Sequence, residues 1–182
     1  MRVLGISGSL RAASLNTALI RAAATMLPPE AELVIYDGLA LLPPYSEETD
    51  VEPAPVSVER FRQAVVGADA VLISTPEYNG SLPGQLKNAL DWGSRPRGAA
   101  PFEGKSVAVV GASPSLFGAV WAQADTRRIL GIMGAMVVER ELPVPQAQDR
   151  FDVDGRLNDA EIASALEEIM RDLLPIAHPV SA

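Results

Sequence analysis

Hydrophobic residues along the chain fall into short runs that alternate with segments of helical spacing. The nearly continuous apolar runs at 68–74 and 106–110 are typical of central parallel strands that are buried on both faces. Shorter runs indicate three further strands at 3–6, 31–36 and 135–138. Parallel strands need long crossover connections, which are usually helices. The pattern therefore predicts a three-layer α/β sheet with right-handed crossovers.

Between the predicted strands, hydrophobic residues recur three and four positions apart. This spacing predicts helices over about 15–27, 57–66, 83–92 and 117–133, and a last helix that ends near Leu173. Asn158, with Glu161 three residues later, has the spacing of a cap for the last helix. In the helix at 117–133, the residues expected to face the core are Val120, Ala124, Ile129 and Met133.

We therefore predict a flavodoxin-like fold, a five-stranded parallel sheet of order 2-1-3-4-5, in a single domain of residues 1–182. In this order, strands one and three are neighbours whose crossovers leave on opposite faces. This arrangement opens a crevice at the carboxyl ends of the two strands. The loops that follow them, at 7–16 and 75–81, are both polar. Their meeting at one point predicts a binding site there.

Composition excludes several classes of partner. The chain has 182 residues, 48% of them hydrophobic, and none of its apolar runs approaches the roughly 20 residues of a membrane span. Its net charge is −8 and its 15 basic residues are scattered, which argues against nucleic acid. The N-terminus runs directly into a predicted strand without the pattern of a signal peptide. We therefore expect a cytoplasmic protein that does not enter a membrane.

The chain contains no cysteine and one histidine. Thiolate nucleophiles, disulfides and iron–sulfur clusters are thereby excluded. His178 lies so near the C-terminus that a catalytic triad would depend on a frayed end. The stretch at 150–161 is similar to a calcium loop, but Arg150 occupies the first ligand position, and a turn at Asp154-Gly155 explains it. We expect no metal site, so redox chemistry would require a bound organic cofactor.

The loop at 7–16 is rich in glycine and serine and leads into a predicted helix. Such a loop places unpaired backbone N–H groups and the positive end of the helix dipole around one point, which suits a phosphate. Further donors come from the side chains of Ser7, Ser9, Arg11, Ser14, Asn16 and Thr17. The loop lacks the lysine of a Walker loop, the glycine spacing of a dinucleotide fingerprint and the second glycine of a hydrolase elbow. A terminal phosphate is the predicted ligand, and the alternative is a turn whose serines cap a helix.

The loop at 75–81 offers different chemistry. Tyr78 supplies a flat ring, and the backbone of 76–80 supplies donors and acceptors for the edge of a heteroaromatic ring. Flavin mononucleotide (FMN) has the matching shape, with one phosphate, a flexible ribityl chain and a stacking ring. The alternative for Tyr78 is an exposed loop tyrosine.

Three segments carry a family resemblance, namely Gly8-Ser9-Leu10-Arg11-x-x-Ser14-x-Asn16, Thr75-Pro76-Glu77-Tyr78-Asn79-Gly80-Ser81 with its continuation to Trp92, and Phe102-x-Gly104-Lys105. They resemble the NADPH-dependent FMN reductase family, which includes the flavodoxin-like chromate and quinone reductases. The resemblance implies that NADPH or NADH donates hydride to bound FMN. It also implies a small-molecule acceptor such as a quinone, free flavin, an azo compound or chromate.

The resemblance further implies which residues contact FMN. On the phosphate side these are Ser9, Leu10, Arg11, Ser14, Leu15 and Asn16. On the isoalloxazine side they are Pro76, Glu77, Tyr78, Asn79 and Gly80. Ser113 would close the pocket beside the ring, and the alternative for Ser113 is a turn residue before Pro114. Backbone N–H groups would stabilise the reduced flavin, so no catalytic side chain is expected.

The loop after the fourth strand departs from the pattern of its relatives. In the chromate reductases this loop is usually richer in glycine and is followed by an arginine, whereas this chain has Phe117 and Trp121 there. We therefore expect altered nicotinamide contacts and an altered substrate entrance. Arg95 and Arg97, after the third helix, are candidates for binding the extra phosphate of NADPH, and the alternative is that they are solvated loop arginines.

Apolar residues between Leu86 and Trp92 exceed what one helix face needs. Together with the resemblance, this excess favours a homodimer packed on that helix, with a tetramer as a further option. Ordinary core packing is the alternative.

Two other functions stay open at this point. An electron-transfer flavodoxin would share the fold, although flavodoxins generally bind the phosphate without a cation such as Arg11. A non-enzymatic nucleotide-binding or phosphate-binding regulatory domain would purify colourless.

Overall fold

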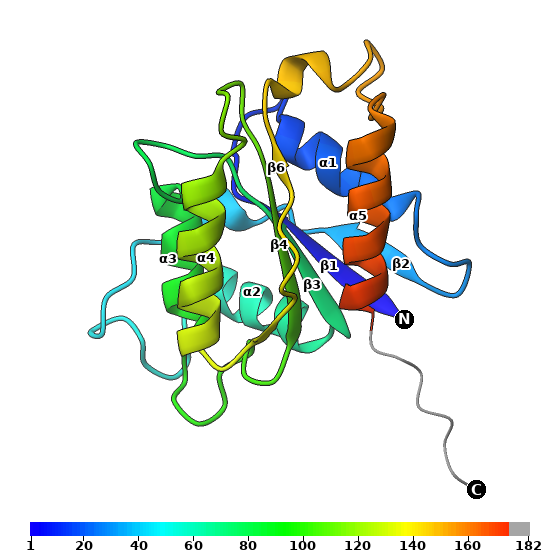
Figure 1. The fold of residues 1–182 in the computed structure, drawn as a ribbon. Coiled ribbons are helices and arrows are strands. Elements are labelled where there is room, and N and C mark those ends of the chain that lie inside the picture. Colours follow the sequence, from blue (N-terminus) through cyan, green and yellow to red (C-terminus); the bar gives the residue numbers. More distant parts are fainter. Residues whose placement is uncertain (175–182) are drawn as a thin grey trace, which may run out of the picture.

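A computed structural model describes residues 1–174, and its centre is a parallel β-sheet (Figure 1). The strands β1 (Arg2–Ser7), β2 (Glu32–Ile35), β3 (Ala70–Ser74), β4 (Ser106–Ala112) and β5 (Met136–Val137) run in the order β2-β1-β3-β4-β5. The predicted flavodoxin-like order is confirmed. His178 lies outside the described residues.

A short strand that the sequence pattern does not predict, β6 (Pro143–Val144), completes the edge of the sheet. β5 pairs with Ser106 and Val107 at the start of β4, whereas β6 pairs with Gly111 and Ala112 at its end. The two strands are therefore halves of one edge, and the chain leaves the sheet between them. Proline lacks a backbone N–H and is tolerated at such an edge. β6 brings the edge up to the carboxyl end of β4.

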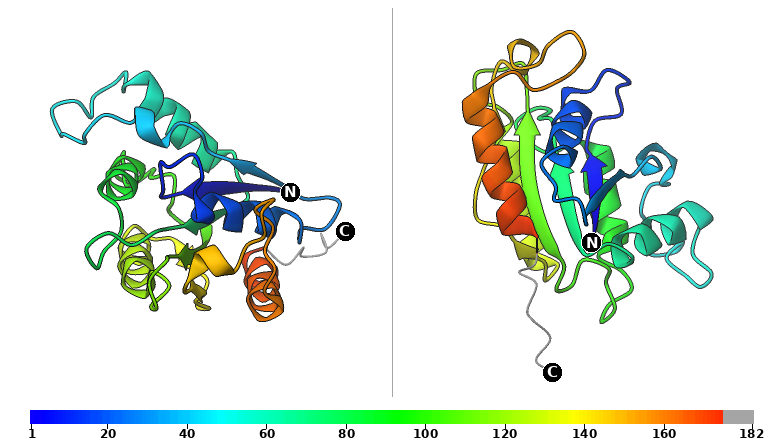
Figure 2. Two further views of the ribbon diagram at one scale, coloured as in Figure 1. Left: turned by 90° about the horizontal axis from the view of Figure 1, so that it is seen from above. Right: turned by 90° about the vertical axis from the view of Figure 1, so that its right-hand side faces the viewer.

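Helices cover both faces of the sheet, which confirms the three layers (Figures 1 and 2). α1 (Leu15–Ala24) and α5 (Ala160–Leu173) pack on one face. The other face is covered by α2 (Val56–Val66), α3 (Gly84–Gly93) and α4 (Val120–Ile132). Single turns of 3₁₀ helix occur at η1 (Leu39–Leu41) and η2 (Ala147–Asp149).

Two predictions about the helices are wrong in detail. The cap of α5 is Asp159, not Asn158, because the Asp159 carboxylate accepts hydrogen bonds from the N–H groups of Glu161 and Ile162 at 3.1 Å each. In α4, Ala124 is exposed, and the buried residues are Ala122, Gln123, Thr126 and Leu130.

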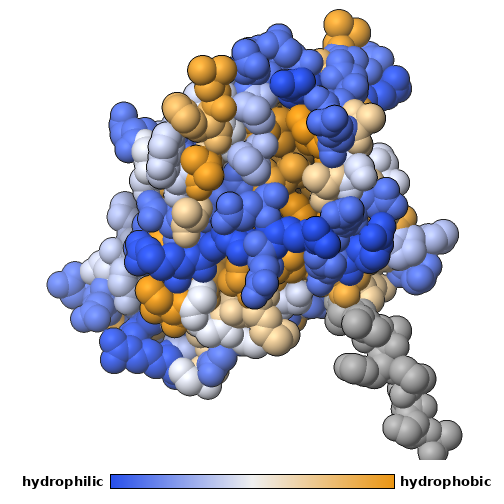
Figure 3. Space-filling model, in the orientation of Figure 1, coloured by the Kyte–Doolittle hydropathy of each residue, from blue (hydrophilic) through white to orange (hydrophobic). Residues whose placement is uncertain are grey.

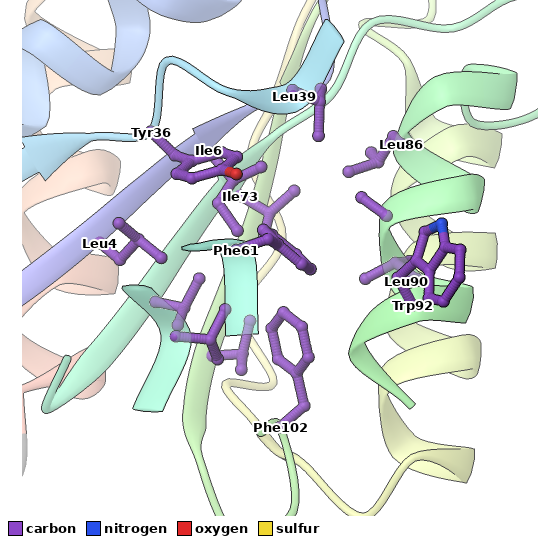
Figure 4. Close-up of a cluster of buried hydrophobic side chains, with 14 of the residues drawn as sticks. Leu4, Ile6, Tyr36, Leu39, Phe61, Ile73, Leu86, Leu90, Trp92 and Phe102 are labelled. Carbon is purple, nitrogen blue, oxygen red and sulfur yellow. The ribbon is translucent and has the colours of Figure 1, made fainter. Parts of the chain in front are cut away.

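The larger hydrophobic core lies between the sheet and the layer of α2, α3 and α4 (Figure 4). Phe61, Trp92 and Phe102 are fully buried there. Gly93 leaves room for this packing, since a Cβ at that position would lie 2.6 Å from the Phe102 ring. The apolar residues of α3 that favoured a dimer surface, Leu86, Ala89, Leu90 and Trp92, are each at most 1% exposed. They are core residues of this chain and leave no spare apolar face on α3.

The strands place the loops that carry the predicted ligand contacts at one end of the sheet. In the right-hand view of Figure 2, the arrowheads of β1, β3 and β4 point upward, toward the loops that follow them. Parallel pairing of β1 with β3 and of β3 with β4 brings these three loops side by side.

Candidate functional site

Asn16, in the first turn of α1, ties β3 and β4 together at their carboxyl ends. Its Oδ1 accepts a hydrogen bond from the Ser74 hydroxyl at 2.8 Å and another from the Ala112 N–H at 3.0 Å. Its Nδ2 donates to the Ala112 carbonyl at 2.9 Å. Ser74 ends β3 and Ala112 ends β4, so one buried amide fixes α1 to both strands. The side-chain oxygen accepts two hydrogen bonds and Nδ2 donates one, so Asn16 can offer a ligand its backbone N–H and the second hydrogen of Nδ2.

The β1–α1 loop presents the N-terminus of α1. Ser14 is the N-cap, and its hydroxyl accepts from the Thr17 N–H at 3.2 Å. Thr17 in turn donates to the Ser7 hydroxyl at 2.9 Å, so these hydroxyls hold the loop. Among the described residues, the N–H groups of Leu15 and Asn16 have no hydrogen-bond partner. Arg11 is exposed in the same loop. These two N–H groups and the Arg11 guanidinium are donors of the kind that bind a phosphate.

Gly8 lets the first two loops touch. A Cβ at this position would lie 3.0 Å from Leu86 and 3.2 Å from Pro76, so a larger residue would push the loops apart. The Gly8 N–H also donates to the carbonyl of Ser74 at 2.8 Å. The β1–α1 loop and the β3–α3 loop therefore form one continuous wall.

The β3–α3 loop contains a tight turn from Tyr78 to Ser81. Both residues exchange backbone hydrogen bonds, at 3.0 and 3.2 Å, and the central residues Asn79 and Gly80 have φ values of 54° and 75°. Positive φ at both central positions is the signature of a type I′ turn, for which Asn-Gly is the preferred pair. Asn79 and Gly80 lie at the exposed tip of the turn. The side chain of Tyr78, at the base of the turn, is half exposed.

Glu77 and Ser81 bind this loop to α4. The Glu77 carboxylate accepts hydrogen bonds from the N–H groups of Trp121 and Ala122 at 3.0 and 3.1 Å. It thereby caps an α-helix whose own N-cap residue, Ala119, provides no side-chain hydrogen bond. The Ser81 hydroxyl donates to Asp125 at 2.7 Å. The contact of Glu77 with α4 is a role that motif reading does not reveal.

The β4–α4 loop forms the third wall and rests on β6. The Ser113 N–H donates to the carbonyl of Val144 at 3.1 Å, and the Ser113 carbonyl accepts from the Ala147 N–H at 3.0 Å. Gly118, with φ 58°, lies so close to β6 that a Cβ would be 2.7 Å from the backbone of Pro143 and Val144. The unpredicted strand therefore positions the loop that carries Ser113.

These walls enclose a pocket of about 170 Å³. Most of the predicted contact residues line it, namely Ser9, Arg11, Ser14, Leu15, Asn16, Pro76, Glu77, Tyr78 and Ser113. Leu10 lines an adjoining hollow of about 290 Å³ that shares Arg11 and Tyr78 with the first. Neither hollow includes Asn79 or Gly80. The sequence motifs do not indicate Ala112 and Pro114, which also line the pocket and contribute through their position in the chain.

Arg95 and Arg97 lie elsewhere. They line a separate hollow of about 630 Å³, together with residues of the loop before α2 and residues at and after the C-terminal ends of α3 and α4. This hollow shares no residue with the pocket. Arg95 is bonded to Asp50 at 2.6 Å, and Asp50 also accepts from Arg62 at 2.8 Å. Burial alone would raise the pKa of Asp50, but hydrogen bonds from Arg62 and Arg95 lower it overall. Within one chain, Arg95 is thus a structural partner of Asp50 and does not reach the pocket.

FMN fits the donor set of the pocket. The free N–H groups at the start of α1 and the Arg11 guanidinium suit its phosphate, and the ring of Tyr78 and the backbone of the adjacent loop suit its isoalloxazine. Within residues 1–174, no cluster of His, Asp or Glu side chains is arranged to hold a metal ion. In the same part of the chain, no helix has the length and apolar character to cross a membrane.

Comparison with known protein families decides between the possible ligands. The profile of NADPH-dependent FMN reductases matches residues 1–149, a range that contains all three loops. The chain belongs to the NADPH-dependent FMN reductase family. This FMN reductase is a flavin-dependent oxidoreductase whose cofactor is FMN and whose reductant is NAD(P)H.

Individual relatives of this FMN reductase align over nearly its whole length. An NAD(P)H-dependent FMN reductase of Pseudomonas aeruginosa is 40% identical over 174 residues, which cover 95% of this chain and 93% of the relative. A quinone reductase of Pseudomonas putida is 39% identical over 155 residues, covering 85% and 83%. Among solved structures, the flavoenzyme NAD(P)H:acceptor oxidoreductase FerB of Paracoccus denitrificans superposes with a TM-score of 0.83 at 34% identity, covering 95% of this chain and 94% of FerB.

Proposed function

We propose that this FMN reductase holds the FMN phosphate at the first turn of α1 and the isoalloxazine against the loop at 76–80. The observation that carries the proposal is the pocket itself, because it joins the free N–H groups of Leu15 and Asn16 to Arg11 on one side and to Tyr78 on the other. When bound, FMN supplies the hydride chemistry, accepting from NADPH or NADH and passing electrons to a small-molecule acceptor. Quinones are the proposed acceptors, since several relatives of similar length are named quinone reductases.

The protein contributes position and electrostatics. Asn16 and Gly8 hold the phosphate loop against the β3–α3 loop, and Glu77 holds the β3–α3 loop against α4. Pro76 and Ser113 exclude water from two sides of the pocket. The Oε2 of Glu77 accepts two N–H groups of α4, so we assign this carboxylate a positioning role. No side chain of this chain is proposed as a proton donor.

The absorption spectrum of the purified protein tests this function. With added FMN, we expect a bound yellow flavin that bleaches under anaerobic NADPH or NADH, and the relative rates identify the preferred nucleotide. Flavin that binds but stays oxidised with both nucleotides would favour the electron carrier. Failure to bind FMN in excess would contradict the proposed site.

Replacement of Arg11 with alanine is expected to weaken FMN binding by roughly 10- to 100-fold, because a charge-assisted contact to phosphate is lost. Riboflavin, which lacks the phosphate, should bind the variant and the unaltered protein equally. Fluorescence quenching of the two flavins measures both affinities. Arg21→Ala removes an exposed arginine from the opposite end of α1 and is the matched control. An equal loss for FMN and riboflavin would show that Arg11 does not act on the phosphate.

We also propose a cytoplasmic homodimer in which each chain is one FMN-binding domain over residues 1–182, with a tetramer as a further option. The family resemblance supports the homodimer, while the buried residues of α3 do not. Light scattering after size exclusion measures the mass in solution.

A further inference from the structure

Two aromatic side chains stand exposed where the β4–α4 loop, the third wall of the pocket, leads into α4. The rings of Phe117 and Trp121 pack against each other with centroids 4.9 Å apart at an interplanar angle of 55°. Phe117 is 57% exposed and Trp121 is 49% exposed, and Leu116 beside them is also exposed. The space-filling view shows hydrophobic residues protruding at the upper left, above the upper end of α4 (Figure 3). An exposed apolar group of this kind beside a pocket marks a contact surface.

The chain connects this aromatic pair to the pocket from two directions. Ser113 and Pro114 line the pocket, and Phe117 follows them in the same loop. Glu77 also lines the pocket, and its carboxylate binds the N–H of Trp121 at 3.0 Å. The pair is therefore anchored beside the pocket, by the loop that carries Ser113 and by the hydrogen bond to Glu77.

The pair does little for the fold. Neither residue belongs to the described hydrophobic cores, whereas Ala122 and Leu130 of the same helix are fully buried. Burying a large aromatic side chain is strongly favourable, so the core does not explain why two of them remain in solvent. A flat partner that covers the pair would explain it.

The charges around the pair favour a neutral partner. The carboxylate of Glu77 binds the start of α4, and Asp125 lies one turn further along the same helix. Asp125 is shared between the Ser81 hydroxyl and Arg128, the latter at 3.7 Å. A small oxyanion would find no aromatic contact and would meet acidic side chains. A neutral planar ring could stack on the aromatic pair without meeting this repulsion.

We propose that Phe117 and Trp121 form an acceptor platform that selects neutral planar acceptors of the quinone type over inorganic oxyanions. The proposal rests on the function proposed above, since it assigns the acceptor side of the same site. The two rings contact the acceptor directly, and Glu77 acts as a positioning residue for Trp121.

Steady-state and rapid-reaction kinetics of the FMN-loaded enzyme test the platform. We expect Trp121→Ala and Phe117→Ala each to lower kcat/KM for a water-soluble benzoquinone about tenfold, because stacking and apolar contact are worth on the order of 1 kcal/mol or more. With ferricyanide, an anionic and non-planar acceptor, kcat/KM should change less than about threefold. Flavin reduction by NADPH in single turnovers should keep its rate. Trp121→Phe should retain most of the quinone activity, and Ile132→Ala, an exposed residue at the far end of α4, is the matched control.

Three outcomes would overturn the platform. The first is an equal loss with both acceptors. The second is a slowed reduction by NADPH, which would assign the pair to the nicotinamide. The third is a change of mass in light scattering together with the loss of activity, which would make the pair an interface between copies of this chain. If the unaltered enzyme is not reduced by either nucleotide, the proposed function fails, and the single-turnover experiment shows this separately.

Discussion

Replacing Asn16 with leucine is expected to destabilise the protein by roughly 3–5 kcal/mol, because three buried polar groups lose their partner and each costs about 1–3 kcal/mol when left unsatisfied. Those groups are the Ser74 hydroxyl and the N–H and carbonyl of Ala112. FMN binding should be lost as well, since the same amide fixes the first turn of α1 to β3 and β4. Urea denaturation of the apoprotein and FMN titration measure the two effects.

Two variants sharpen the Asn16 experiment. Asn158→Leu makes the same substitution at an exposed asparagine and should leave both quantities within error. Asn16→Asp keeps the acceptor for Ser74 and the Ala112 N–H but cannot donate to the Ala112 carbonyl, so an intermediate loss is expected. If Asn16→Leu were as stable as the unaltered protein, the hydrogen bonds of Asn16 would make no net contribution to the free energy of unfolding.

Gly118→Ala is expected to lower the free energy of unfolding by roughly 2–4 kcal/mol, from backbone strain at positive φ together with overpacking against β6. A Cβ would lie 2.7 Å from the backbone of Pro143 and Val144, which cannot move aside without breaking the edge of the sheet. Because Val144 holds Ser113, the variant should also bind FMN more weakly.

Gly98 offers the matched control for Gly118. Its φ is 79° and no atom lies within 4 Å of a built Cβ, so Gly98→Ala measures the strain alone. The difference between the two variants isolates the clash with β6. Thermal unfolding and FMN titration on both variants supply the comparison. Equal effects in the two variants would show that the contact of Gly118 with β6 is unimportant.

The fold was predictable because burial on both faces leaves a plain signal. Val71, Leu72 and Ile73 are fully buried, so β3 appears in the sequence as an unbroken apolar run. The same reasoning does not find β6, which has two residues and begins with proline. Its existence depends on the free edge at the end of β4, which no local pattern records.

The inward face of α4 shows a second limit. Gln123 and Thr126 are buried polar residues that a hydrophobic pattern assigns to the surface. Thr126 donates to the Ala122 carbonyl at 2.7 Å, and Gln123 donates to the Gly118 carbonyl at 3.0 Å. These hydrogen bonds give partners to the Thr126 hydroxyl and to the Gln123 Nε2, whereas the buried Oε1 of Gln123 has no partner among the described residues. The partners become visible only in three dimensions.

The sequence motifs indicated most of the residues that line the pocket, but they did not indicate what each side chain binds. The motifs indicate Asn16 and Glu77 as flavin contacts, yet the side chain of each binds distant backbone, at Ala112 and at the start of α4. Sequence carries the spacing within each loop but not the contact between loops.

The hydrogen bonds of Asn16 also set an order of events during synthesis. Its partner Ala112 lies 96 residues further along the chain, and Val144, which holds the third wall, lies further still. When only β1, α1 and β2 have been synthesised, the β1–α1 loop is complete. The residues of β3 and β4 that bind Asn16 and hold this loop in place are not yet present. Contacts between such distant residues form late in folding. We therefore expect FMN to be loaded after β6 has been synthesised, and a truncated chain that lacks β4 and β6 to bind no FMN.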